Sequence, residues 1–127
     1  MGARYLIDTN ALLEFVAGLL PADAHTFLTR TIDDDFVVSV INRIEVLGHV
    51  SANQALTDFM DLATTLPLDD AVMSRTIALR KANKIKLPDA IIAATALVHN
   101  LTLVSRNDKD FRLINGLSCL NPYSITK

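Results

Sequence analysis

The sequence alternates short apolar runs with longer segments of helical pattern, and this order limits the fold more than any other feature. Residues 4–8, 36–40 and 101–105 are rich in Val, Ile and Leu, and residues 117–121 form a further run. None of them shows the strict alternation of apolar and polar residues that a half-solvated strand requires. Buried runs of this kind are typical of a parallel sheet covered by helices on both faces. We therefore expect one three-layer α/β/α domain, residues 1–127, with a central parallel sheet of about five strands.

The segments between these runs have the start and stop signals of helices. Thr9 or Asn10 is expected to cap the first helix, and Pro88 is expected to begin the last one. Residues 65–68 are predicted as an edge strand, because Pro67 cannot donate to a central ladder. The predicted helices span residues 9–18, 21–30, 41–49, 52–64, 69–83 and 88–99.

Length, composition and cysteine content limit the class of protein. The chain has 127 residues, of which 50% are apolar and 20% charged, enough for one domain with a proper core. Its one cysteine, Cys119, excludes an internal disulfide framework and favours a reducing cytoplasm. The first residues make a poor secretory signal, and the longest uncharged run, residues 90–105, is shorter than a membrane span requires. We expect a soluble, cytoplasmic protein with no membrane contact.

Charge is unevenly distributed along the chain. The formal net charge is −2, yet residues 71–88 hold five basic side chains and no acid. On composition alone a solvated helix face is the favoured explanation of such a stretch, and a local patch for phosphates is the alternative. The basic residues are Arg75, Arg80, Lys81, Lys84 and Lys86.

Acidic residues fall where a parallel sheet forms its sites. Open α/β sheets bind ligands outside the carboxyl ends of their strands. Asp8 ends the first predicted strand, Glu45 lies in the helix after the second, and Asp89 lies in the first turn of the last helix. Asn107 and Asp108 follow the strand after that helix. Taken singly, each acid is also explained as a helix cap or a solvated side chain, so the argument rests on their joint placement.

Carboxylates gathered at one edge suit metal-assisted hydrolysis of phosphodiesters. Mg²⁺ is usually held by one or two carboxylates together with waters and phosphate oxygens. Without a cation such carboxylates repel one another, so some of them should hold protons. The sequence contains no G-x-S-x-G elbow, P-loop, G-x-G-x-x-G or H-E-x-x-H motif. Glu45 and His49 lie four residues apart and could share a zinc ion, but two ligands make a weak zinc signal.

Four ordered blocks resemble the PIN domain, and in detail the VapC-type ribonuclease toxins of toxin–antitoxin pairs. They begin with Leu6-Ile-Asp-Thr-Asn10 and Val38-Ser-Val-Ile-Asn-Arg-Ile-Glu-Val-Leu-Gly48. They continue with Leu87-Pro-Asp-Ala-Ile-Ile-Ala-Ala94 and Leu103-Val-Ser-Arg-Asn-Asp-Lys-Asp-Phe111. The resemblance covers essentially the whole chain. It implies an endoribonuclease that binds Mg²⁺ or Mn²⁺ and cuts RNA, commonly tRNA or rRNA.

The resemblance also implies roles for single residues. Asp8, Glu45 and Asp89 would be the metal-binding acids, with Asp8 and Asp89 holding the cation and Glu45 orienting or deprotonating the attacking water. At the position where the family often has a fourth acid, this sequence has Asn107. Asn107 or the adjacent Asp108 would therefore complete the catalytic set. Ser39 and Ser105 would position carboxylates or water, and Thr9 and Asn10 would brace the Asp8 turn. Arg43, Arg106 and the basic residues of 75–86 would guide the RNA backbone.

Partners and rival functions follow from the same comparison. The family implies a homodimer held inactive by a small VapB-like antitoxin, whose C-terminal segment enters the acidic groove. One alternative is a PIN-like module that binds RNA or serves assembly without cutting. Retention of all three core acids argues against it, since a dead site has no physical need for mutually repelling carboxylates. Another alternative is a metal-dependent phosphatase or phosphotransfer domain, which would need a D-x-D motif where the chain has Asp8-Thr-Asn10.

Overall fold

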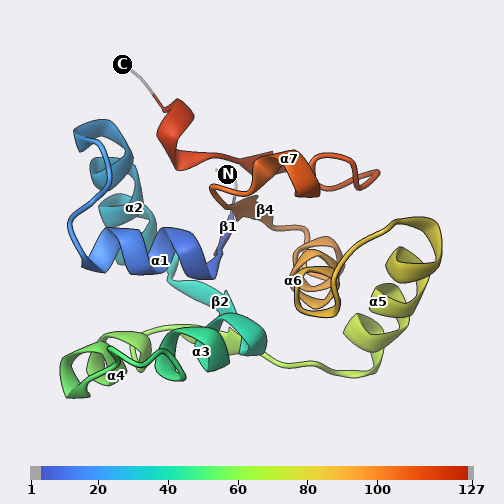
Figure 1. Ribbon diagram of the computed structural model, residues 1–127, viewed down its shortest axis with the longest axis horizontal. Helices are drawn as coiled ribbons and strands as arrows, with labels where there is room; N and C mark the ends of the chain where they lie inside the picture. The colour runs from blue at the N-terminus through green and yellow to red at the C-terminus, as the bar shows by residue number, and fades with distance from the viewer. Residues whose placement is uncertain (1–3, 126–127) are drawn as a thin grey trace.

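The chain adopts the expected three-layer arrangement in a computed structural model that describes residues 4–125 (Figure 1). The strands are β1 (Tyr5–Ile7), β2 (Val37–Ser39), β3 (Thr64–Leu66), β4 (Thr102–Val104) and β5 (Cys119–Leu120). The helices are α1 (Thr9–Val16), α2 (Ala22–Asp35), α3 (Val40–Leu47), α4 (Gln54–Met60), α5 (Asp70–Ala82), α6 (Leu87–Val98) and α7 (Asp108–Phe111), followed by the 3₁₀ turn η1 (Pro122–Ser124).

All strand pairs are parallel, as the buried apolar runs predicted. Hydrogen bonds join β1, β4 and β5 in that order, and a second ladder joins β2 to β3. β2 also lies beside β1, so the two ladders form one central layer. β3 occupies the outer edge of its ladder, which agrees with the expected edge strand.

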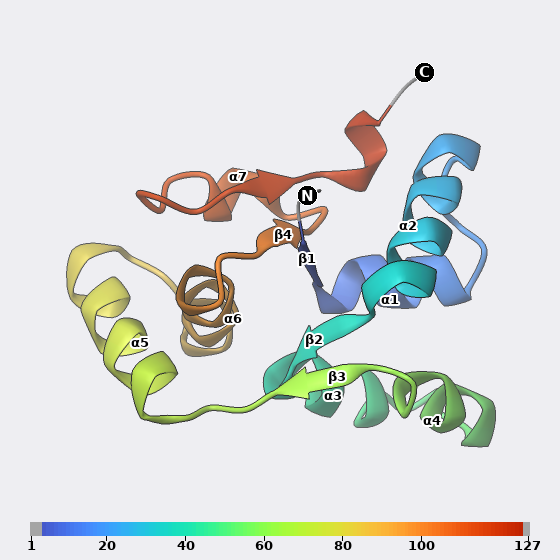
Figure 2. The same cartoon turned by 180° about the vertical axis from the view of Figure 1, so that it is seen from behind.

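Consecutive strand residues point into two separate cores. Leu6 packs in a cluster with residues of α5 and α6, whereas Ile7 packs in a cluster with residues of α1, α2 and α4. Figures 1 and 2 show α5 and α6 on one side of the strands and α1 and α2 on the other. Because successive side chains of a strand point to opposite faces, burial of both faces requires this double helical cover.

Helix boundaries differ from the predictions at several places. Asp8, rather than Thr9 or Asn10, caps α1, because its carboxylate accepts from Thr9 N. α2 continues five residues beyond the predicted end at 30, to Asp35. The buried side chain of Thr31 and the ion pair between Arg4 and Asp35 hold this extra turn. α4 is shorter than predicted, and α7 was not predicted.

The beginning of α6 matches the expectation closely. Leu87 is its first residue and Pro88 lies in its first turn, where the missing N–H of proline costs no hydrogen bond. His99 caps the C-terminal end. Within residues 4–125, none of the helices combines the length and apolar character needed to cross a lipid bilayer.

Candidate active site

The carboxyl ends of the central strands bring together side chains from distant parts of the sequence. Asp8 directly follows β1 and its N–H donates to Val104 O of β4 over 2.9 Å. Ser105 directly follows β4, and its N–H donates to Leu120 O of β5 over 3.0 Å. Ser39 ends β2. The main-chain ladder therefore fixes the relative positions of these polar residues before any side-chain contact is made.

Asp8 is a buried carboxylate held by three donors. Asp8 is only 5% exposed. Oδ1 accepts from Thr9 N over 2.9 Å and from Asn42 Nδ2 over 3.1 Å. Oδ2 accepts from Ser105 Oγ over 2.7 Å. Burial nevertheless raises the pKa of Asp8 above its usual range, and the negative charges of Asp89 and Glu45 add to that rise.

Asn42 is a site residue that the sequence reasoning missed. It is fully buried in α3 and donates Nδ2 to Asp8 Oδ1 and, over 3.2 Å, to Thr9 Oγ1. Its Oδ1 accepts from the N–H and the hydroxyl of Ser39, which completes a capping box at the start of α3. The spacing Ser39-x-x-Asn42 is the signal that could have revealed it.

Glu45 lies at the mouth of the site rather than inside it. The residue is exposed, and its neighbour Ile44 is 61% exposed. Thr9 Oγ1 donates to Glu45 Oε1 over 2.6 Å. That bond fixes one carboxylate oxygen and leaves the other available to a ligand.

Asp89 faces the same space from the first turn of α6. It is half-buried, and burial raises its pKa most strongly. Repulsion from Glu45 and then from Asp110 raises the pKa further, whereas the Lys86 ammonium lowers it. The negative charges of Asp8, Glu45 and Asp89 are therefore close enough to oppose one another.

The structure distinguishes between the two residues expected to complete the set. Asn107 lines the pocket, and its N–H donates to Ser105 Oγ over 3.0 Å. Asp108 does not line the pocket, because its Oδ1 accepts from Asn121 Nδ2 over 3.1 Å. Within this segment, the acid whose charge acts on Asp89 is Asp110, which the sequence reasoning did not select. Asp108 and Asp110 both lie in the short helix α7, and their side chains have different neighbours: Asn121 for Asp108 and Asp89 for Asp110.

The candidate site is a pocket of about 360 Å³ between α1, α3, α6 and the segment after β4. It unites three of the predicted carboxylates with Asn107, although these residues are spread over most of the sequence. Its lining consists of Asp8, Thr9, Asn10, Leu13, Glu45, His49, Asp89 and Asn107. Three of these side chains are carboxylates and none is a lysine or arginine, so the pocket favours a positively charged ligand.

The donor set fits a hard divalent cation. All candidate ligands are oxygens, and burial together with repulsion between the acids raises the pKa values of Asp8 and Asp89. Within the described part of the chain, no three His, Cys, Asp or Glu side chains lie so that they could hold one metal ion together. A cation here would therefore be held by one or two carboxylates, with water and phosphate oxygens as its other ligands.

The basic residues divide into two groups. Arg43 donates to Met60 O and to Asp61, and Arg106 pairs with Glu14 over 3.1 Å, so both are engaged within the protein. Lys84 and Lys86 instead line a neighbouring pocket of about 220 Å³ that shares Asp89 and Asn107 with the candidate site. Positive charge therefore lies directly beside the acidic pocket.

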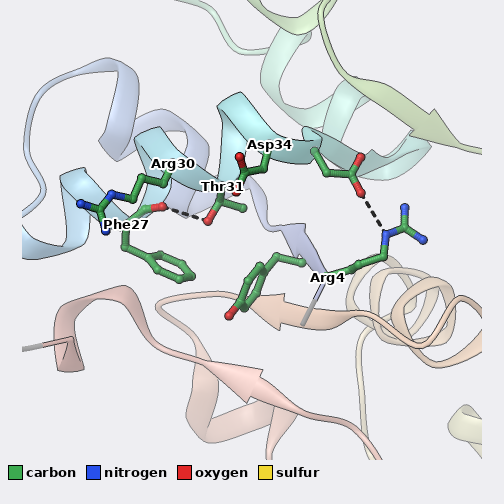
Figure 3. Close-up of a pocket in the computed structure, with 7 residues that line it drawn as sticks. Arg4, Phe27, Arg30, Thr31 and Asp34 are labelled. Carbon is green, nitrogen blue, oxygen red and sulfur yellow. Dashed lines mark hydrogen bonds and ion pairs between the residues drawn. The ribbon is translucent and has the colours of Figure 1, made fainter. Parts of the chain in front are cut away.

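Another pocket, of about 250 Å³, lies at the opposite end of β1 (Figure 3). Tyr5 and Phe27 form an edge-to-face aromatic pair there, and Arg4 pairs with Asp35. Its remaining lining residues are Arg30, Thr31 and Asp34. It contains none of the acids expected at the site, and its two arginines are matched by two aspartates.

This fold and this cluster of acids at the strand ends define a class of protein. A family model described as the PIN domain matches residues 5–117. The chain therefore belongs to the PIN domain family, as its four sequence blocks predicted.

Solved structures give the more particular likeness. The chain is similar to one in a toxin–antitoxin complex from Klebsiella pneumoniae, with 30% identity over 98% of this chain and 100% of that chain and a TM-score of 0.74. It shares its fold with a chain of VapBC2 from Rickettsia felis bound to a promoter DNA fragment, at 22% identity, 92% and 97% coverage and a TM-score of 0.78. A chain of VapBC-1 from nontypeable Haemophilus influenzae is similar at 21% identity, 93% and 97% coverage and a TM-score of 0.75. No curated protein sequence matches the chain.

Proposed function

We propose that this protein is a Mg²⁺- or Mn²⁺-dependent endoribonuclease and the toxin of a toxin–antitoxin pair. The observation that carries the proposal is the convergence of Asp8, Glu45 and Asp89 on one pocket from three distant segments. The raised pKa values of Asp8 and Asp89 support it, because the site tolerates its own charge poorly without a cation. The proposed substrate is RNA, with tRNA or rRNA as the target class.

Different residues of the site would have different roles in the hydrolysis. Asp8 and Asp89 would hold the cation, which would supply positive charge at the reacting phosphate and lower the pKa of water. Glu45 has one oxygen fixed by Thr9 and would accept a proton from the attacking water with the other. The water oxygen forms a bond to phosphorus as the bond to the 3′ oxygen breaks. The 3′ oxygen takes up a proton, so the products are a 5′-phosphate and a 3′-hydroxyl.

The surroundings of the pocket suit an RNA strand and a protein inhibitor. Lys84 and Lys86 would contact the RNA backbone beside the pocket, and this contribution should weaken with added salt. The acidic pocket would attract a basic side chain of a VapB-like antitoxin. The Klebsiella likeness to a toxin–antitoxin complex supports that partner. Homodimer formation, a cytoplasmic location and a single domain over residues 1–127 belong to the same proposal.

The test combines metal removal with substitution. Purified protein is incubated with total RNA and Mg²⁺, and the reaction is repeated with EDTA and with the Asp89→Asn protein. Cleavage should stop in both repeats, while the exposed control Asp33→Asn should cut normally. Glu45→Gln should lower the rate by about 10²- to 10⁴-fold, as expected for loss of a general base. Cutting that persists in EDTA and in Asp89→Asn would rule out the metal mechanism.

A parallel reaction with a small phosphate ester separates nuclease from phosphatase activity. The pocket is proposed to act on a polymer held by flanking contacts, so the ester should remain intact at protein concentrations that cut RNA. Mapping the RNA ends then identifies the target and checks the predicted 5′-phosphate. Hydrolysis of the ester without cleavage of RNA would assign the site to the phosphatase class.

A further inference from the structure

The candidate site is rich in acceptors and poor in free donors. Its three carboxylates only accept hydrogen bonds when ionised. Thr9 directs its hydroxyl to Glu45, and the amide of Asn10 lies 3.5 Å from Ser105 Oγ. Within residues 4–125, His49 and Asn107 line the pocket and their side chains donate no hydrogen bond to the protein. A phosphate entering this pocket would need these donors.

Ser51 determines which nitrogen of the His49 ring carries the proton. Ser51 N donates its hydrogen to His49 Nδ1 over 3.2 Å, and Ser51 Oγ lies 2.7 Å from the same nitrogen. A backbone N–H can only donate, so Nδ1 must act as the acceptor. In the neutral ring the proton is therefore on Nε2. This tautomer makes Nε2 a hydrogen-bond donor, and it does not offer the Nε2 lone pair that a zinc ion shared with Glu45 would require.

His49 and Asn107 approach the pocket from separate elements. His49 follows Gly48, which ends α3, and its N–H donates to Val46 O over 3.3 Å. It lies four residues beyond Glu45, and both residues line the pocket. Asn107 lies beyond the end of β4, next to Ser105. The two donors therefore border the carboxylates from the α3 side and from the β4 side.

We propose that His49 contacts the substrate, with Nε2–H donating to a phosphate oxygen of the RNA strand in the acidic pocket. This inference rests on the proposed function for the identity of the strand. A donor at this edge offsets part of the repulsion between the phosphate and the carboxylates, and it holds the strand on the α3 side. Phosphate contacts of this kind fix the position of a strand without reading its bases.

The first experiment tests the contact without requiring cleavage. Side-chain ¹⁵N NMR of the Asp89→Asn protein reports the neutral tautomer of His49, which should carry its proton on Nε2. A short single-stranded oligoribonucleotide of mixed sequence should then shift the His49 Nε2 resonance. His49→Ala in the same background should weaken binding of that RNA by about tenfold, the usual size for loss of one hydrogen bond to a charged group.

Matched variants separate the contact from general damage to the fold. His49→Gln keeps an N–H donor at the end of a side chain and should retain most of the binding. Ser51→Ala keeps the backbone N–H that sets the tautomer and should bind RNA normally. His25→Ala removes an exposed histidine of α2, outside the pocket, and should also bind normally. In the cleavage-competent protein, His49→Ala should raise KM more than it lowers kcat.

The outcomes for the contact and for the nuclease activity are distinct. RNA binding that depends on His49, together with no RNA cleavage by the native protein in Mg²⁺ or Mn²⁺, refutes the nuclease proposal and keeps the contact. Cleavage and binding that are both unchanged in His49→Ala overturn the contact and keep the nuclease proposal. A neutral ring with its proton on Nδ1 overturns the contact as well. Absence of any RNA binding by the Asp89→Asn protein overturns it too.

Discussion

Ser105 donates its hydroxyl to Asp8 Oδ2 over 2.7 Å, although 97 positions of sequence separate the two residues. The parallel pairing of β1 with β4 places them side by side at the strand ends. The Ser105 oxygen itself accepts from Asn107 N and lies 3.5 Å from Asn10 Nδ2. The hydroxyl proton of Ser105 is therefore available for the hydrogen bond to Asp8. Ser105 thus connects the buried carboxylate to the segment that lines the other side of the pocket.

Ser105→Ala should destabilise the protein at neutral pH by about 1–3 kcal/mol, the cost of leaving a buried polar group without its partner. The pKa of Asp8 should rise further, because the lost bond stabilised the ionised carboxylate. The loss should therefore shrink as the pH falls and Asp8 takes up a proton. Urea unfolding at neutral and acidic pH measures both effects. The exposed Ser74→Ala on α5 is the control and should cost little; an equal cost for both variants would contradict the assignment.

The topology made the position of the site predictable. Buried apolar runs predict parallel strands, and parallel strands collect their carboxyl ends at one edge. That reasoning placed Asp8 and Ser105 together, and the position of Pro88 placed Asp89 in the first turn of a helix that faces them. These inferences depend on main-chain geometry, which the apolar pattern of the sequence reports well.

Side-chain orientation was not predictable in the same way. The Ser39-x-x-Asn42 spacing indicates a capping box at the start of α3, but it does not show that the Asn42 amide also reaches Asp8. Asp108 and Asp110 differ by two residues in a segment with no apolar periodicity. The four-residue helix α7 decides between them by turning Asp108 toward Asn121. The last turn of α2 was missed because three consecutive aspartates suggest a loop, whereas Thr31 and the Arg4–Asp35 pair hold a helix there.

Asn42→Asp should be among the most damaging single changes in the site. It removes a donor to Asp8 and adds another carboxylate in a fully buried position. An uncompensated buried charge costs roughly 3–5 kcal/mol, so the variant should unfold at much lower urea concentration at neutral pH. Acidic pH should recover part of the loss through protonation. The exposed Asn100→Asp, at the turn after α6, is the matched control and should show little change.

Asp89→Asn should raise the melting temperature at neutral pH when divalent cations are absent. Burial and repulsion raise the pKa of Asp89 above 3.8 in the folded protein. Between 3.8 and the higher folded value, the folded state holds a proton that the unfolded state has released. Stability therefore falls as the pH rises through that window, and it stays reduced above it. Below this pH range, the higher melting temperature of Asp89→Asn should disappear. Thermal unfolding in EDTA over a pH series measures this; a lower melting temperature at neutral pH would contradict the sign.

Addition of Mg²⁺ or Mn²⁺ should reverse that order. A cation that binds the folded protein stabilises it by RT ln(1 + [L]/Kd), about 2.7 kcal/mol at a hundredfold excess over Kd. The native protein should therefore gain melting temperature on addition of the cation, and Asp89→Asn should gain much less. Sodium chloride at matched ionic strength is the control, because it screens repulsion without occupying the pocket. Equal stabilisation of both proteins by the divalent cation would contradict this prediction, because it would show that the cation binds without Asp89.

Asp110→Ala and Asp108→Ala should affect different properties. Asp110 raises the pKa of Asp89 through its charge and lies with Asp89, Lys84 and Lys86 in the neighbouring pocket. Its removal should lower the pKa of Asp89 and weaken binding of Mn²⁺, because negative charge near the cation is lost. Asp108 accepts from Asn121 and does not line the acidic pocket, so Asp108→Ala should leave Mn²⁺ affinity unchanged and loosen the segment around η1. Calorimetric titration with Mn²⁺, together with the carboxyl ¹³C shift of Asp89 over a pH series, distinguishes the two. Weaker Mn²⁺ binding in Asp108→Ala and unchanged binding in Asp110→Ala would identify Asp108 as the fourth acid.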